Sequence, residues 1–175
     1  MDAGRLRALV RDVPDFPRQG ILFRDISPLL ADPQALREAV AALAQLSRPL
    51  AVDVVIAAEA RGFLLGPALA LELGAGFALA RKPGRLPRET VSATYALEYG
   101  DDALELHTDA IRPGTRVLVH DDLLATGGTA GALCALTERV GATVVGCAFI
   151  IELAGLGGRA SLAGYDVRAL MRYDD

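Results

Sequence analysis

The chain is poor in cysteine, in positive charge and in long hydrophobic runs. Its two cysteines, Cys134 and Cys147, both lie among apolar residues, which favours two buried free thiols over a disulfide. The net charge of −4 argues against a general nucleic-acid binder, because such proteins are usually basic. The most apolar stretch, residues 140–156, contains glycines and Glu152 and is too short to span a membrane.

A targeting segment is also missing from the pattern. Residues 1–11 place charges among leucines and contain no apolar run before a cleavage site. Together with the free thiols, this predicts a cytoplasmic protein that binds neither membranes nor nucleic acid. What the chain does have is apolar material. Of its 175 residues, 52% are hydrophobic and 23% are charged, which predicts one globular domain with a single core.

Runs typical of buried strands alternate with helical patterns along the chain. Asp32 and Pro33 form a good helix start, because Asp caps a helix and Pro fits its first position. We therefore expect an α/β fold with a central parallel sheet flanked by helices, whose ligands bind at the carboxyl ends of the strands. The expected strands cover 52–57, 77–80, 143–152 and a short run from Val117, and the expected helices cover 33–46, 63–73 and 128–139.

Periodicity fails between residues 82 and 94, where two prolines, a glycine and several charges predict a long loop. Loops of this length in compact domains often act as lids or binding loops. Residues 95–99 and 104–107 then alternate like the two strands of a hairpin that turns at 100–102. The sequence thus predicts a polar loop followed by a hairpin.

The segment 117–130 carries the clearest chemical signal. A short apolar strand leads into the adjacent carboxylates Asp121 and Asp122, which suit sugar hydroxyls or a positively charged centre. The turn that follows, 125–129, contains two glycines and two threonines at the start of a helix. Such a turn presents backbone N–H groups to a phosphate. Together these features predict a site for a ribose that carries a 5′-phosphate.

This segment resembles the signature of the type I phosphoribosyltransferases, which bind phosphoribosyl pyrophosphate (PRPP). Other segments match that family in the same order along the chain, and they look most like its members that act on adenine. The resemblance covers about residues 13–160, and its motifs occupy 23–28, 59–63, 81–84, 97–100 and 121–129.

The resemblance implies a single phosphoribosyltransferase domain over residues 1–175. A hood is expected at about 13–30 plus parts of the C-terminal tail, and a flexible lid at about 82–104. The implied substrates are the small molecules adenine and PRPP, the products are AMP and pyrophosphate, and the assembly is a homodimer. Mg²⁺ is implied as well, bound mainly through PRPP or pyrophosphate and water, without a cage of protein ligands.

By the same resemblance, each part of the substrates has candidate partners. Asp121 and Asp122 contact the ribose hydroxyls and favour positive charge at C1′. Arg61 binds pyrophosphate, and Glu98 accepts a proton or pairs with the purine, so that these four are the catalytic candidates. The 5′-phosphate is assigned to Ala125, Thr126, Gly127, Gly128 and Thr129, pyrophosphate to Glu59, Ala60, Arg61, Arg81 and Lys82, adenine to Leu22, Phe23, Arg24 and Leu153, and the lid to Tyr95 and Tyr99.

One position departs from the family pattern. His120 stands where the signature has an aliphatic strand residue, and strand alternation points it away from Asp121. It is either a core histidine with its own hydrogen bonds or a ring that bonds an acid behind the carboxylate pair and tunes its field.

Two other functions stay open at this point. The same fold acting on hypoxanthine, guanine or xanthine often uses a lysine or another strong donor on the base, and Lys82 is the only lysine in the chain. A PRPP-sensing regulator that binds without turnover would need a nucleic-acid surface or a partner domain, and the acidic chain offers no sign of either.

Overall fold

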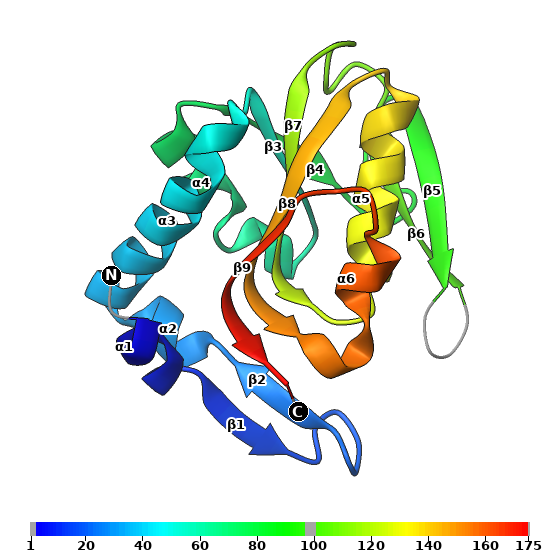
Figure 1. The fold of residues 1–175 in the computed structure, drawn as a ribbon. Coiled ribbons are helices and arrows are strands. Elements are labelled where there is room, and N and C mark those ends of the chain that lie inside the picture. The colour runs from blue at the N-terminus through cyan, green and yellow to red at the C-terminus, as the bar shows by residue number, and fades with distance from the viewer. Residues whose placement is uncertain (1–2, 97–100, 175) are drawn as a thin grey trace.

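A five-stranded parallel sheet forms the centre of the protein, whose computed structural model describes residues 3–96 and 101–174. The strand order is β4-β3-β7-β8-β9, and every neighbouring pair runs parallel (Figure 1). This confirms the predicted α/β class. The strands are β3 (Val54–Ala58), β4 (Gly76–Ala80), β7 (Arg116–Leu124), β8 (Thr143–Leu153) and β9 (Val167–Tyr173).

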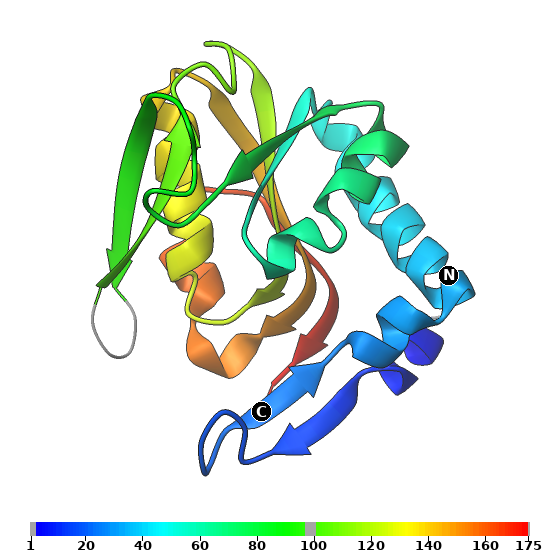
Figure 2. The same ribbon diagram turned by 180° about the vertical axis from the view of Figure 1, so that it is seen from behind.

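Helices cover both faces of this sheet (Figure 1, Figure 2). Helices α3 (Pro33–Ser47) and α4 (Gly66–Leu73) cover one face, and α5 (Gly128–Arg139) covers the other. Side chains of β7 alternate between the two cores, because Val119 packs on the α5 side whereas Leu118 packs on the α3–α4 side. Burial on both faces explains why the strands appear in the sequence as continuous apolar runs.

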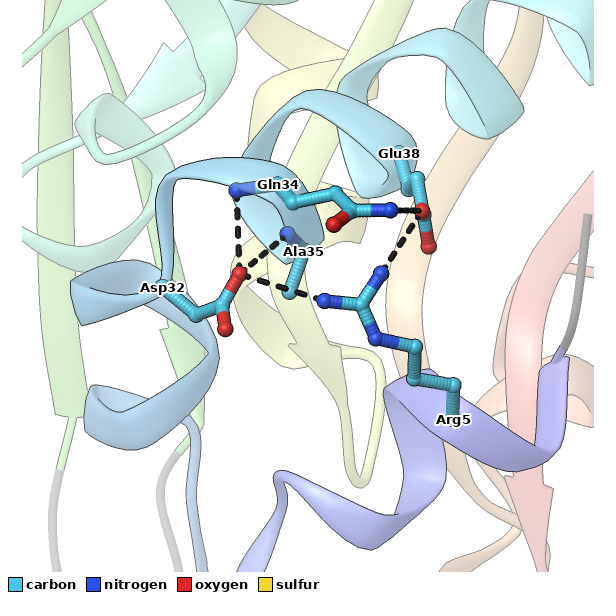
Figure 3. Close-up of polar contacts among 5 residues, drawn as sticks. All are labelled: Arg5, Asp32, Gln34, Ala35 and Glu38. Atoms are coloured by element: carbon cyan, nitrogen blue, oxygen red, sulfur yellow. Dashed lines mark hydrogen bonds and ion pairs between the residues drawn. The ribbon is translucent and has the colours of Figure 1, made fainter.

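Helix α3 begins where the sequence predicts. The Asp32 carboxylate accepts hydrogen bonds from the backbone N–H groups of the two residues after Pro33, at 2.9 and 2.8 Å. Arg5 of α1 (Ala3–Ala8) reaches the same carboxylate and that of Glu38 (Figure 3). The cap therefore also attaches the N-terminal helix to α3.

The hood is an antiparallel hairpin of β1 (Arg11–Pro14) and β2 (Leu22–Asp25), which lies near the carboxyl end of β9 (Figure 1). The ring of Tyr173, at the end of β9, lies between two guanidinium groups. Arg7 is 4.1 Å and Arg24 is 4.2 Å from the ring centroid. These cation–π contacts tie the hood to the C-terminal strand, so the tail completes the central sheet and also holds the hood.

The predicted hairpin is present, but it begins earlier than expected. β5 (Thr90–Ala96) pairs with β6 (Asp101–His107), so residues 90–94 form a strand where the sequence predicts a loop. The physical reason is local, since the threonines and the valine of this segment are β-branched and favour a paired strand. β5 packs against α5, and only residues 82–89 remain as the connecting loop.

Short elements complete the chain. No helix within residues 3–96 and 101–174 is long and apolar enough to cross a membrane. As predicted, Cys134 and Cys147 are buried free thiols. Their sulfur atoms lie 3.8 Å apart. The short elements are α2 (Ser27–Ala31), α6 (Gly158–Ser161) and the 3-10 helices η1 (Arg48–Leu50), η2 (Arg61–Phe63) and η3 (Ala154–Leu156).

Candidate active site

A cleft of about 290 Å³ opens at the carboxyl ends of β3 and β7. It brings together most of the residues predicted for ribose, phosphate and pyrophosphate, although they come from distant parts of the chain. This placement at the carboxyl edge of a parallel sheet is the one that the fold favours for ligands. The lining residues are Ala58, Glu59, Ala60, Arg61, Lys82, Tyr95 and 121–130.

The acidic pair lies within a strand rather than after it. The sequence predicts a strand that ends before Asp121, but β7 continues to Leu124, where it still pairs with Glu152 of β8. The neighbouring strand explains the difference, since β8 runs to Leu153 and offers backbone partners over this whole length. Both carboxylates are therefore held by regular sheet backbone.

Asp121 sits in a crowded position. Burial and the adjacent charge of Asp122 raise the pKa of Asp121 to about 8, and its Oδ1 accepts the Asp122 N–H at 2.9 Å. A Cβ on Gly62 would stand 3.4 Å from this oxygen and 3.0 Å from the Cβ of Ala57, so only glycine fits easily there. Asp121 is thus a carboxyl whose neutral form is favoured by burial and by its charged neighbour.

Arg61 connects the acidic pair to the hood. Its Nε and Nη2 donate to Oδ2 of Asp122 at 2.7 and 2.6 Å, and Asp122 is only 3% exposed. The Arg61 guanidinium lies 5.0 Å from the centroid of the Phe23 ring and remains partly exposed to the cleft. One guanidinium therefore fixes a buried carboxylate and still offers N–H donors to an anion.

The turn after β7 forms the start of α5, as predicted. Gly127 precedes the helix with φ +88, a conformation that favours glycine, and the first intrahelical bond joins the N–H of Gly131 to the Gly127 carbonyl at 2.8 Å. The N–H groups of the first turn have no acceptor inside a helix. These N–H groups form the positive end of the helix dipole, which suits a phosphate.

Glu59 organises the two basic residues that follow β4. Its Oε2 accepts from Nη2 of Arg81 at 2.8 Å, and its Oε1 accepts the backbone N–H of Lys82 at 2.6 Å. The hydrogen bond from Arg81 holds the pKa of Glu59 below its ordinary value. Both Glu59 oxygens are thus engaged within the protein, and the cleft lining includes Lys82 but not Arg81.

Lys82 projects from this loop toward the hairpin. Its ammonium donates to the hydroxyl of Tyr95 at 3.2 Å and forms an ion pair with Asp102. Burial opposes its charge, but the hydrogen bonds to Asp102 and Tyr95 outweigh burial and raise the pKa of Lys82. The lysine is therefore charged and already partnered.

The predicted adenine residues differ in their exposure and in their contacts. Phe23 packs edge-on against Phe16 of the hood, with ring centroids 5.1 Å apart, and its ring borders Arg61. Leu22 is exposed, whereas the Arg24 side chain is buried against Asp12 and Tyr173. Leu153 is half-buried against the α3–α4 core.

Glu98 and Tyr99, predicted as proton acceptor and lid residue, lie outside the described residues. His120 is fully buried, and its Nδ1 donates to the carbonyl of Ala148 at 2.9 Å, while its Nε2 has no hydrogen-bond partner among the described residues. Burial lowers the pKa of His120 to about 4. The ring is thus a core histidine with one of its two nitrogens bonded, and the alternative of a bond to an acid is not found.

Two acidic residues outside the predicted set also form ion pairs. Asp102 binds Lys82, and buried Glu152 binds Arg159 of α6 through oxygen–nitrogen contacts of 2.6 and 2.9 Å. The only signal for Glu152 was a single acid inside the apolar run 140–156. Asp102 gave none, because its partner lies 20 residues earlier in the chain.

No cluster of three histidine, cysteine or acidic side chains within residues 3–96 and 101–174 is placed to hold a metal ion. The cleft does contain carboxylate oxygens, from Asp121 and Asp122, which are suitable donors for Mg²⁺. These residues fit a magnesium ion whose other ligands are substrate oxygens and water.

Comparisons with known proteins show the family of the chain. The family described as "Phosphoribosyl transferase domain" matches residues 25–168. The adenine phosphoribosyltransferase of Rubrobacter xylanophilus is 59% identical over 171 residues, which cover 97% of this chain and 92% of the relative.

Solved structures give the same result. The adenine phosphoribosyltransferase of Thermoanaerobacter pseudethanolicus is 46% identical with a TM-score of 0.96, covering 98% of this chain and 99% of that one. The enzyme from Saccharomyces cerevisiae, solved with an imino-altritol bisphosphate and adenine, is 39% identical with a TM-score of 0.91 and covers 96% and 97%.

Proposed function

The chain belongs to the phosphoribosyl transferase family, and on this basis we propose that it transfers the 5-phosphoribosyl group of PRPP to adenine, giving AMP and pyrophosphate. The observation that carries the proposal is the joint placement of Asp121 and Asp122, Arg61 and the N-terminus of α5 in one cleft. The adenine phosphoribosyltransferase of Rubrobacter xylanophilus is 59% identical to this chain over 97% of its length, and its name supports adenine as the acceptor.

The cleft divides naturally between the two ends of PRPP. The turn 125–129 takes the 5′-phosphate on backbone N–H groups, and the carboxylates of Asp121 and Asp122 take the ribose hydroxyls. When pyrophosphate departs, positive charge develops at C1′, and these carboxylates stabilise it. Burial and Asp122 raise the pKa of Asp121, and positive charge at C1′ would favour its ionised form.

Pyrophosphate departs toward the basic side of the cleft. Arg61, the N–H groups beside Ala60 and the ammonium of Lys82 line that side. Glu59 acts as a positioning residue, because it holds both Arg81 and the Lys82 backbone. Asp121 and Asp122 are the carboxylates of the cleft that would contact a Mg²⁺ ion held mainly by PRPP and water, and such an ion would neutralise phosphate charge.

Adenine binds under the hood. Phe23 offers an aromatic face beside Arg61, and backbone groups of residues 22–24 face the purine edge, with Leu22 and Leu153 as apolar contacts. Glu98 accepts a proton or pairs with the purine, and Tyr95 and Tyr99 belong to the lid at about 82–104 that excludes water during the reaction. The hood at about 13–30 and this lid are parts of one domain, 1–175.

We propose a homodimer in the cytoplasm. Leu64, Leu71 and Leu79 are exposed on the continuous segment from η2 to β4, and β4 is the edge strand of the sheet. Contiguous exposed apolar patches mark interaction surfaces, and the proposal takes these three leucines as parts of one such patch. The free thiols Cys134 and Cys147 support a reducing compartment.

Release of pyrophosphate from PRPP and Mg²⁺ tests the function, with adenine, hypoxanthine, guanine and xanthine supplied separately. We expect release with adenine alone. Release with an oxopurine instead would overturn the assignment of the base pocket but keep the chemistry. PRPP binding without release for any base would make the protein a PRPP-sensing regulator.

A further inference from the structure

Lys82 is the only lysine of the chain, and its ammonium is already occupied. It lines the cleft on the pyrophosphate side, yet it donates to two groups of the β5–β6 hairpin, the Tyr95 hydroxyl at 3.2 Å and the Asp102 carboxylate. Tyr95 also donates to Asp102, at 3.1 Å. These contacts form a closed polar network between the loop after β4 and the hairpin.

We propose that Asp102 is an internal competitor of pyrophosphate, a carboxylate that holds the Lys82 ammonium in the free protein and releases it to the diphosphate of the substrate. This inference rests on the proposed function, because it takes the diphosphate of PRPP as the incoming anion.

The placement of Asp102 supports a competing role rather than contact with substrate. Lys82 and Tyr95 line the cleft, whereas Asp102 is not part of its lining. Asp102 therefore draws the ammonium toward the hairpin and neutralises its charge from outside the substrate's volume. Arg61, the other cation of the lining, is likewise paired, with Asp122. Unlike Asp122, Asp102 has no assigned role on the ribose.

The exchange is energetically accessible. Lys82 and Asp102 are both partly exposed, and exposed ion pairs of this kind are weak. A lysine ammonium has three N–H donors, of which the hairpin accepts two, so a diphosphate oxygen can bind the third before it replaces Asp102. Diphosphate carries more negative charge than one carboxylate and wins the competition.

A purely structural role for Asp102 and the proposed competing role lead to opposite changes in anion binding. If Asp102 serves only to hold the hairpin, its loss weakens the site or leaves it unchanged. If Asp102 competes with the substrate, its loss makes the lysine available and tightens anion binding. The sign of one binding change therefore separates the two roles.

The test is calorimetric titration of the full chain with pyrophosphate and Mg²⁺. We expect Asp102→Asn to bind pyrophosphate about fivefold more tightly than the wild type. In a Lys82→Met background, adding Asp102→Asn should change nothing. Asp109→Asn is the matched control, because it removes one negative charge from a carboxylate that pairs with Arg88 outside the cleft lining. Weaker or unchanged binding by Asp102→Asn, or equal tightening in the Lys82→Met background, would overturn the proposal.

A second readout does not depend on any ligand. Lys82 is the only lysine of the chain. Acetylation of the folded protein, followed by mass spectrometry of the peptide that contains Lys82, therefore reports directly on its side-chain amine. Loss of the carboxylate lowers the pKa of Lys82, so Asp102→Asn should be acetylated about fivefold faster than wild type or Asp109→Asn. Equal rates would contradict the ion pair in solution. Wild-type AMP formation, measured in parallel, tests the proposed function separately.

Discussion

His120 is a polar side chain that is fully buried within the central sheet. Its Nδ1 is bonded to the Ala148 carbonyl, but its Nε2 is buried without a partner among the described residues. A buried acceptor that loses its water without gaining a partner destabilises the folded state by about 1–3 kcal/mol. The residue therefore lowers stability without touching the cleft.

Replacement of His120 by Val should raise the free energy of unfolding by about 1 kcal/mol at pH 7. The substitution should also reduce the loss of folding stability on acidification. The pKa of His120 is about 4 in the folded protein, against about 6.5 when unfolded, so between these values the unfolded chain binds the proton first. Stability is therefore lost as pH falls from 6.5 toward 4.

Urea unfolding of both proteins at pH 7 and pH 5 measures these effects. Turnover should stay within a few-fold of wild type. If His120→Val is less stable at pH 7, or loses as much stability on acidification as the wild type, the ring has a second hydrogen bond and the interpretation is wrong.

The turn 125–129 packs closely against α6. Gly158, which begins α6, lies so near the turn that an added Cβ would stand 2.3 Å from the carbonyl oxygen of Ala125. Arg159, the next residue, is held by buried Glu152 and donates to the Val167 carbonyl. Because α6 is fixed in this way, it cannot easily yield to a larger residue.

Gly158→Ala should therefore displace the turn and raise the KM for PRPP about tenfold or more, with a smaller effect on adenine. Gly155→Ala is the matched control in the preceding η3, because a Cβ there meets only one oxygen, at 3.8 Å. Steady-state kinetics of the two variants makes the comparison. Equal KM values for PRPP would show that α6 does not position the turn.

At the scale of elements, local signals were the reliable ones. The cap at Asp32 and the start of α5 at Gly128 were predictable, because a short polar segment determines each of them. The end of β7 was not, since its length depends on pairing with β8, 27 or more residues later in the chain. The strand over residues 90–94 was missed for a different reason, since its β-branched residues directly follow a segment rich in proline, glycine and charge, and the predicted loop was extended over them.

The candidate site follows the same rule. Motifs predicted the turn 125–129, the acidic pair and Arg61, and the structure brings them into one cleft. Motifs did not predict that Asp122 would bind Arg61 or that Asp102 would bind Lys82, since such pairs depend on how distant elements meet.

At the scale of the whole molecule, the exposed leucines between η2 and β4 predict how two copies meet. Leu71 of α4 is 82% exposed, the highest value among the exposed large hydrophobic side chains of the described residues. If the proposed dimer forms through these leucines, Leu71→Glu should convert it to a monomer, as measured by sedimentation, because a charge in an apolar interface is costly. Leu156→Glu, on η3, is the control and should stay dimeric. A Leu71→Glu protein that remains dimeric would place the interface elsewhere.

At Asp121, the stability of the folded protein and the proposed catalytic role make opposite demands on the side chain. Its folded pKa of about 8 lies above the ordinary 3.8, so the folded protein binds the extra proton between these values. Stability therefore falls as pH rises through that window. Burial favours a neutral side chain here, whereas the proposed mechanism uses a carboxylate beside C1′.

Asp121→Asn separates these two demands, and the rate of AMP formation from adenine and PRPP is the measurement to make. The variant should be at least as stable as the wild type at pH 8 and should form AMP about a hundredfold or more slowly. A folded Asp121→Asn protein that forms AMP at close to the wild-type rate would remove the acidic pair from the mechanism.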